Sequence, residues 1–224
     1  HNIARLDLDS TRGKHAYSEI ISRFETGETD ILVGTQMVTK GLDFDNVSLV
    51  GILNADNLIN FPDFRAYERS FQMLMQVSGR AGRKKEQGKV IIQSYNPGHS
   101  LLDFVVKNDY KSFIDYELSE RKKFNYPPFS RLLEITVKGR DESRTAQAAN
   151  FLTSELKKQI PSILGPVTPP VSRIKNFYIR TILIKFQRQV KLSEARQRML
   201  SAIDRYKINP VSKNILLQID VDPI

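Results

Sequence analysis

The first half of the chain alternates short uncharged runs with amphipathic segments, and this alternation limits the possible folds more than any other feature. Strand, helix, strand, strand, helix and strand are expected in turn over 3–8, 13–26, 31–33, 47–53, 64–77 and 89–93. The run Ile31-Leu32-Val33 is compact and uncharged, which suits a strand that is buried on both faces of a sheet. Segment 13–26 places its apolar residues on one helical face and ends at Gly27. This order predicts an α/β domain with a parallel sheet over residues 1–98.

The second half starts a new pattern after a helical linker, which we assign to residues 99–128. The linker ends at Asn125-Tyr126-Pro127-Pro128, a run that neither a helix nor a central strand tolerates. The expected elements are a strand at 130–138, a helix at 141–160, strands around 171–174 and 178–186, a helix at 193–206 and a strand at 215–221. A proline-rich turn is expected between the first helix and the second strand. The order βαββαβ over residues 129–224 predicts a smaller α+β domain of the ferredoxin-like type.

Composition narrows the class of protein. The 224 residues contain no cysteine and three scattered histidines, so neither a disulfide nor a metal site is expected in the chain. We see no apolar run long enough for a membrane span and no leader sequence, so we expect a cytoplasmic protein. The formal net charge of +9 favours a polyanionic partner, most simply a phosphate backbone. Because the chain opens at His1 without a methionine, we expect it to be part of a longer protein.

The strongest chemical signal is the run Gln76-Val77-Ser78-Gly79-Arg80-Ala81-Gly82-Arg83 at the end of a predicted helix. Gly79 and Gly82 each precede an arginine, so two guanidinium groups project from the C-terminal end of the helix. A guanidinium is permanently charged and grips phosphate oxygens in two places. Arg80 and Arg83 could therefore stabilise charge on a phosphoryl group during transfer. The alternative is a basic C-cap, because cations near a helix C-terminus are favourable in any case.

A second signal is the loop Val33-Gly34-Thr35-Gln36-Met37-Val38-Thr39-Lys40-Gly41-Leu42-Asp43-Phe44, which follows a predicted buried strand. The hydroxyl of Thr35 and nearby backbone N–H groups could hold a phosphate, and Lys40 adds positive charge. Gly41 permits a tight turn, and Asp43 could accept a ribose hydroxyl. The alternative is a polar loop with Asp43 in an ordinary turn.

A basic and aromatic set lies on the expected strand pair of the second domain. Its members are Arg173, Lys175, Phe177, Tyr178, Arg180 and Lys185. We select Arg173, Lys175, Tyr178 and Arg180 as nucleic-acid-binding candidates, because such surfaces combine cations with stacking rings. Strand alternation would put Lys175 on the face opposite Tyr178 and Arg180. The aromatic members could equally belong to the core.

Taken together, the loop and the arginine run resemble motifs V and VI of superfamily 2 helicases. Nearly the whole chain resembles the C-terminal part of the bacterial replication-restart helicases, the primosomal protein N′ family. The resemblance rests on residues 34–41, 63–69 and 76–83, the turn Leu164-Gly165-Pro166, and the C-terminal run from Leu217 to Pro223.

The resemblance implies part of a RecA-like second helicase lobe, followed by the smaller domain, in an ATP-dependent 3′-to-5′ DNA helicase. Such a protein acts in primosome assembly at stalled or branched forks. ATP and Mg²⁺ would be bound mostly by another lobe of the parent protein, and zinc by an insertion outside this chain. The implied partners are forked or single-stranded DNA, primosome proteins and single-strand-binding protein, with no membrane.

The resemblance also implies a role for each motif residue. Arg83, Arg80 and Gln76 would be catalytic; Gly41, Asp43, Gly79 and Gly82 would contact the nucleotide; Gly34, Thr35, Gln36 and Lys40 would contact DNA. One departure matters: the phosphate-binding pattern Gly-x-x-x-x-Gly-Lys-[Ser/Thr] is absent from the chain. We therefore expect that the isolated chain does not hydrolyse ATP. An ATP-independent nucleic-acid-binding scaffold with a helicase-like fold and an RNA-directed superfamily 2 enzyme are the alternatives.

Overall fold

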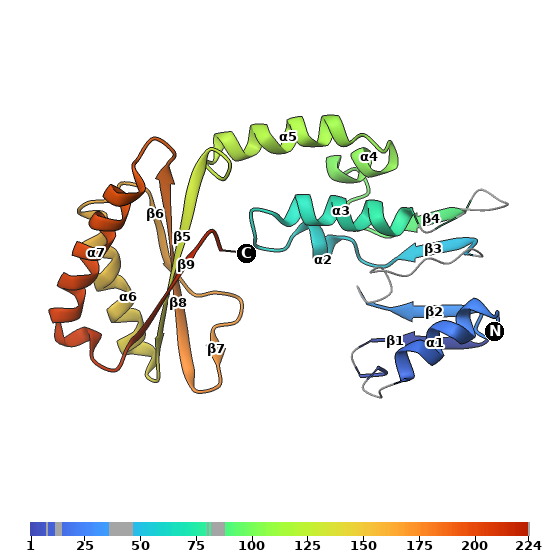
Figure 1. The fold of residues 1–224 in the computed structure, drawn as a ribbon, viewed down its shortest axis with the longest axis horizontal. Helices are drawn as coiled ribbons and strands as arrows, with labels where there is room; N and C mark the ends of the chain where they lie inside the picture. The colour runs from blue at the N-terminus through green and yellow to red at the C-terminus, as the bar shows by residue number, and fades with distance from the viewer. Residues whose placement is uncertain (8, 12–14, 36–46, 80, 82–87, 224) are drawn as a thin grey trace. The chain divides into compact units, whose positions relative to one another are not determined.

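The structure is a computed structural model that describes residues 1–224 except 8, 12–14, 36–46, 80, 82–87 and 224 (Figure 1). The chain divides into two compact units, unit 1 (His1–Glu117) and unit 2 (Leu118–Ile224). The division falls inside the predicted linker, because helix α5 (Tyr110–Lys123) begins in unit 1 and ends in unit 2. Within the described residues, we find no helix with the length and apolar character that crossing a membrane requires.

The described residues of unit 1 form two pairs of parallel strands. Its elements are β1 (Ile3–Leu6), α1 (Ala16–Glu25), β2 (Ile31–Gly34), β3 (Leu49–Ile52), α2 (Asp56–Ile59), α3 (Ala66–Ser78), β4 (Lys89–Ile92), α4 (Ser100–Val106) and the start of α5. Strand β1 pairs with β2, and β3 pairs with β4, both in parallel. Parallel neighbours need a crossover connection, which α1 supplies for the first pair and α2 with α3 for the second. The predicted α/β class of this half is confirmed.

The larger core of unit 1 forms where three helices meet. Phe71 and Leu74 of α3, Leu101 of α4 and Phe113 of α5 are all at most 4% exposed. The rings of Phe71 and Phe113 stack face to face, with centroids 4.2 Å apart and planes 5° from parallel. Burial of one such aromatic side chain stabilises the fold by about 1.5–3 kcal/mol. This packing fixes α3, the helix that carries the arginine run at its C-terminal end.

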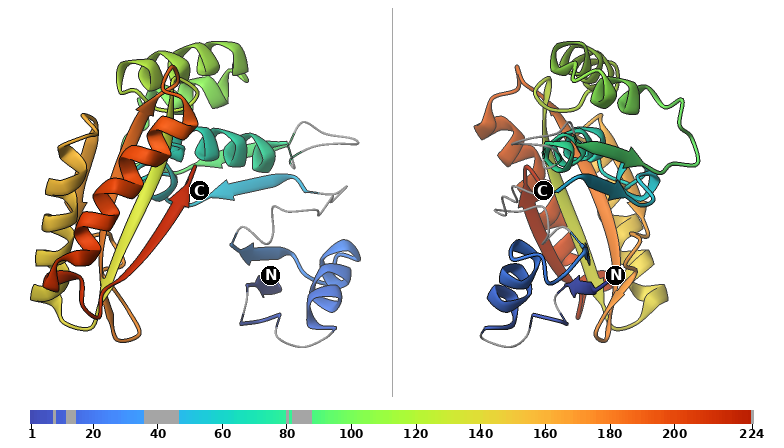
Figure 2. Two further views of the ribbon diagram at one scale, coloured as in Figure 1. Left: turned by 60° about the vertical axis from the view of Figure 1, so that its left-hand side comes forward. Right: turned by 90° about the vertical axis from the view of Figure 1, so that its right-hand side faces the viewer.

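Unit 2 is an antiparallel sheet with two helices on one face (Figures 1 and 2). After the end of α5, its elements are β5 (Ser130–Gly139), α6 (Glu142–Lys157), β6 (Ile163–Val167), β7 (Arg173–Ile174), β8 (Phe177–Gln187), α7 (Leu192–Ile208), a 3₁₀ turn (Pro210–Ser212) and β9 (Leu216–Val221). The strand order is β6-β8-β5-β9, and the short β7 pairs with the start of β8. All these pairs are antiparallel.

Alternation along the central strands separates a core face from an uncovered face. Ile135 and Val137 of β5 and Ile182 and Ile184 of β8 are fully buried in the same cluster as residues of α6 and α7. Their neighbours on the opposite face, such as Thr136, are only partly buried. The helices therefore cover one face of the sheet, and the period-two pattern of the sequence is the cause.

An ion-pair network joins α6 to α7. The carboxylate of Glu155, in a side chain only 7% exposed, accepts hydrogen bonds from Lys158 and from Arg205 Nε, the latter at 2.7 Å. The hydrogen bond from Lys158, and then that from Arg205, lower the pKa of Glu155. The ionised carboxylate therefore stabilises the packing of the two helices.

Three elements differ from the sequence prediction. Where a proline-rich turn was expected, β6 forms an edge strand that contains Pro166; an edge position tolerates proline because one side of the strand needs no ladder bond. The register of β6 shifts between Leu164 and Val167, at Gly165 with its φ of +102°. The expected strand at 171–174 shrinks to the two residues of β7. Helix α2, a single turn after β3, was not predicted.

Candidate functional site

The predicted phosphate-binding loop begins at the carboxyl end of β2. Gly34 is the last residue of that strand, Thr35 follows it, and both are exposed. The hydroxyl of Thr35 is therefore accessible to a ligand at this edge. The other predicted members, Gln36, Lys40, Gly41 and Asp43, lie outside the described residues.

The arginine run begins at the C-terminal end of α3. Gln76 is exposed in the last turn, and the N–H of Gly79 caps the helix by donating to the carbonyl of Met75 at 3.0 Å. Gly79 has a φ of −68°, so an ordinary helical angle ends the helix here. A Cβ added to Gly79 would find no contact closer than 3.5 Å, so neither space nor backbone angle demands glycine. Arg80, Gly82 and Arg83 lie outside the described residues.

The opposite end of α3 is fixed by Asp63. One carboxylate oxygen accepts from the backbone N–H of Arg65 at 2.8 Å, which forms an Asx turn immediately before the helix begins. The other lies 2.8 Å from a guanidinium nitrogen of Arg69, one turn into α3. These two contacts of Asp63, together with the Phe71–Phe113 stack, fix the orientation of α3 within unit 1. The sequence indicated these residues as part of a signature but gave them no role.

The basic and aromatic candidates of unit 2 cluster at the β7–β8 hairpin. Arg173 and Tyr178 are directly paired across the strands, and the guanidinium carbon lies 5.0 Å from the ring centroid. Alternation predicted that Lys175 would lie on one face of a strand. Instead it occupies the turn between β7 and β8, with a φ of +53°. Arg140, which the sequence did not single out, lies over the ring of Phe177 at 5.7 Å. Both rings of the hairpin are therefore accompanied by an arginine.

Arg180 and Lys185 have partners elsewhere in unit 2. Arg180 lies 3.0 Å from a carboxylate oxygen of Glu142 in the first turn of α6, and its side chain is 12% exposed. Lys185 is 8% exposed and donates to the carbonyl of Phe124 at 2.8 Å, with its Nζ 3.4 Å from the ring centroid of Tyr126. Burial lowers the pKa of Lys185. Lys185 therefore secures the segment that leads into β5, and it does not belong to the exposed hairpin surface.

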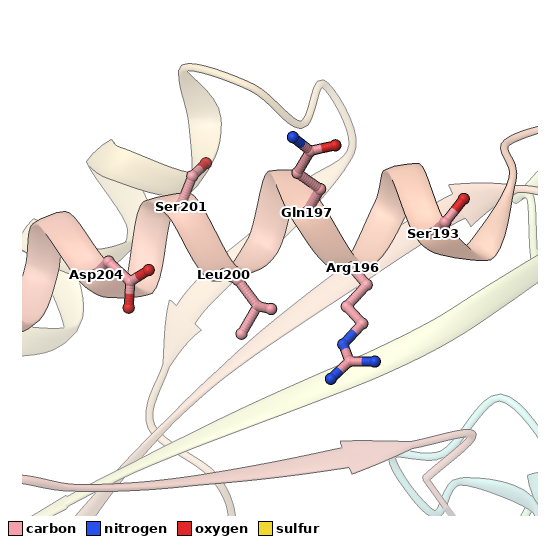
Figure 3. Close-up of a pocket in the computed structure, with 6 residues that line it drawn as sticks. All are labelled: Ser193, Arg196, Gln197, Leu200, Ser201 and Asp204. Carbon is pink, nitrogen blue, oxygen red and sulfur yellow. The ribbon is translucent and has the colours of Figure 1, made fainter.

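A shallow groove along α7 does not have the shape of a ligand-binding site. It is lined by Ser193, Arg196, Gln197, Leu200, Ser201 and Asp204 (Figure 3). All six residues belong to one helix; Arg196 and Leu200 project to one side of it, and Gln197 and Ser201 to the other (Figure 3). Such side chains do not converge on a ligand. In the part of the chain that the structure describes, there is also no cluster of three or more His, Cys, Asp or Glu side chains suited to a metal ion.

Two known protein families match separate parts of the chain, and the boundary between the two compact units lies between these matches. The family described as "Helicase conserved C-terminal domain" matches residues 2–85, a range that contains both predicted motifs. The family described as "Primosomal protein N C-terminal domain" matches residues 122–224.

Curated relatives match nearly the whole chain. The replication restart protein PriA of Bacillus subtilis (strain 168) is 39% identical over 224 residues, which cover 99% of this chain and 28% of that protein. PriA of Synechocystis is 42% identical over 98% of this chain and 26% of its own length. PriA of Chlamydia pneumoniae is 36% identical, with 98% and 29% covered. The chain thus spans less than a third of the length of these relatives.

Proposed function

Because the chain belongs to the PriA family of replication restart proteins and corresponds to the C-terminal part of its members, we propose that it works as the second motor lobe and C-terminal domain of an ATP-dependent DNA helicase. The match to the helicase C-terminal family over residues 2–85 carries the proposal, because that range includes the Thr35 loop and the arginine run. The translocation polarity, 3′ to 5′, is part of the proposal by resemblance.

In this proposal Arg83 and Arg80 contact the terminal phosphate of ATP, with Gln76 beside them. The exposure of Gln76 in the last turn of α3 and of Gly79 at its end supports this role, since a group that reaches towards another lobe must not be buried in its own. Bound ATP with Mg²⁺ supplies the phosphoryl transfer that drives the motor. The chain's own part is to place permanent positive charge where negative charge develops. Gly41, Asp43, Gly79 and Gly82 line the nucleotide, and Gly34, Thr35, Gln36 and Lys40 contact the DNA backbone.

We further assign unit 1 to a partial RecA-like lobe and unit 2 to a ferredoxin-like domain. Parallel strand pairs joined by helices support the first assignment. The antiparallel order β6-β8-β5-β9, with α6 and α7 on one face, supports the second, because βαββαβ folds place the first and third strands at the centre of the sheet.

The β7–β8 hairpin is the proposed DNA contact of unit 2. Arg173 and Lys175 are exposed, and the guanidinium of Arg173 lies over the ring of the half-buried Tyr178. A cation next to an aromatic face suits a phosphate and its attached base. Arg180 contributes by holding β8 to Glu142 of α6, which makes the hairpin base rigid. Primosome proteins and single-strand-binding protein remain proposed partners of the parent, and zinc is assigned to its other domains.

ATP hydrolysis with and without single-stranded DNA tests the motor assignment. We expect DNA-stimulated turnover by the full-length parent, no turnover by the 224-residue chain alone, and none by a parent from which the chain is deleted. DNA binding by the parent without any DNA-stimulated turnover would favour an ATP-independent scaffold. Turnover by the isolated chain would contradict the assignment of most nucleotide contacts to another lobe.

A further inference from the structure

The carboxyl edge of the β3–β4 pair holds side chains that remain in solvent although their backbone is firmly fixed. Tyr95, just after β4, is 92% exposed, the largest fraction among the large apolar and aromatic side chains of the described residues. Leu53, just after β3, is 77% exposed. We call Leu53 and Tyr95 the Tyr95 edge. Ligands of α/β proteins commonly bind at the carboxyl ends of parallel strands.

Asp56 ties the two connections of this edge together. Its carboxylate accepts from the backbone N–H of Tyr95 at 2.9 Å and from the hydroxyl of Ser94 at 3.0 Å. That hydroxyl in turn accepts from the N–H of Asn96 at 3.0 Å. The Tyr95 N–H first, and then the Ser94 hydroxyl, lower the pKa of Asp56, so the carboxylate stays ionised near neutral pH.

The backbone on the other connection is also constrained. The N–H of Ala55 donates to the carbonyl of Gln93 at 3.0 Å, which continues the link between the strands beyond their paired ends. Asn54, directly before it, has a φ of +55°, in the left-handed region that non-glycine residues seldom adopt. Such strain persists only where surrounding bonds hold it. The edge is therefore built rigidly around a tyrosine ring that it does not bury.

We propose that the Tyr95 edge stacks bases of single-stranded DNA, an inference that rests on the proposed DNA-motor function. A ring exposed on both faces lacks the walls that a small free ligand needs, so a mononucleotide would stay mostly solvated. A strand whose backbone is held elsewhere by this basic chain can add a stacked base without such walls. Because the backbone is already fixed, ordering the platform costs little entropy on binding.

Fluorescence anisotropy with a labelled oligothymidine and the 224-residue chain tests the proposal. Base stacking on one ring corresponds to roughly 5- to 150-fold in affinity, so Tyr95→Ala should weaken binding by that factor. Tyr95→Phe keeps the ring and should bind within about threefold of the wild type. Tyr110→Ala removes another exposed tyrosine, 61% exposed on α5, and serves as the matched control. A fully paired duplex of equal length should show no loss in Tyr95→Ala.

A fluorescent variant gives an independent readout, because the chain contains no tryptophan. Tyr95→Trp places a single tryptophan on the edge, and we expect its emission to be quenched on saturation with the oligonucleotide. Equal affinity of Tyr95→Ala and wild type, with no quenching in Tyr95→Trp, would overturn the stacking proposal while leaving DNA binding intact. If the wild-type chain bound no oligonucleotide at all, the proposed DNA contacts of the whole chain would fail with it.

Discussion

Tyr206 provides a sharp test of how the core of unit 2 is stabilised. The side chain is 1% exposed on α7, and its ring lies 6.3 Å from that of Phe151. Among the described residues, its hydroxyl has no hydrogen-bond partner. In the unfolded chain the same hydroxyl is hydrated, so folding leaves it without a bond that water would supply. Replacing Tyr206 with phenylalanine removes that hydroxyl and keeps the ring.

The expected effect is an increase in stability. A buried hydroxyl without a partner costs about 1–3 kcal/mol. Loss of one oxygen atom forfeits several contacts of about 0.1–0.2 kcal/mol each, or somewhat under 1 kcal/mol in total. The difference predicts that Tyr206→Phe raises the free energy of unfolding of unit 2 by about 1 kcal/mol.

Native-state hydrogen exchange of α7 amides reports the opening of unit 2 separately from unit 1. An added 1 kcal/mol should slow exchange by about fivefold. Tyr178→Phe, whose ring is only half-buried, is the matched control and should leave the rates nearly unchanged. Faster exchange in Tyr206→Phe would refute the reasoning, because it would mean that the hydroxyl makes a stabilising bond.

The same hydroxyl predicts a pH dependence. Burial raises the pKa of Tyr206 from 10.0 to about 12. Because the pKa is higher in the folded state, the ionisation of this group leaves the free energy of unfolding unchanged below pH 10. It lowers that free energy as the pH rises from 10.0 through about 12. The difference in urea midpoint between Tyr206→Phe and the wild type should therefore widen over this interval. A constant difference would show that the hydroxyl does not titrate as a buried group.

Three further predictions concern unit 2 and its hairpin. A Cβ at Gly139 would meet the hydroxyl of Thr145, so Gly139→Ala should cost about 1–3 kcal/mol in thermal unfolding, whereas Gly51→Ala, with open space around it, should not. Because its two basic partners lower the pKa of Glu155, its contribution is present above the ordinary value of 4.5 and is lost as the pH falls through the lower folded value; Glu155→Gln should flatten this acid limb of the stability curve. Arg173→Ala removes one proposed phosphate contact. It should reduce the slope of log binding constant against log salt concentration by about 1, and an unchanged slope would contradict the contact.

Periodicity within one element was readable from the sequence. The apolar spacing of α3 predicted a helix over 64–77, and the observed bounds are Ala66–Ser78. The alternation in β5 predicted 130–138, one residue short of the observed strand. In both elements the core face repeats with the period of the backbone, so a local window contains the needed information.

Contacts between residues that are distant in the chain could not be predicted from the sequence. Lys185 looks like a surface cation in its strand, yet it is buried by Phe124 and Tyr126, about 60 positions away in the chain. Arg180 likewise forms an ion pair with Glu142, which is distant in the sequence. The backbone N–H of Tyr95 donates to the carboxylate of Asp56, which lies 39 positions away on another connection. Such contacts require the register of strands that are distant in sequence, which no local pattern determines.

The central claim is that Arg83 acts on the phosphate of ATP, and ATP turnover by the full-length parent with Arg83→Ala tests it most directly. We predict that kcat of DNA-stimulated hydrolysis falls by about 10³ to 10⁵ while the affinity for ATP changes little, because the guanidinium acts on charge that develops only in the transition state. Lys84→Ala, which removes the neighbouring positive charge, should retain most of the turnover. An unchanged kcat in Arg83→Ala, or an equal loss in Lys84→Ala, would contradict the account.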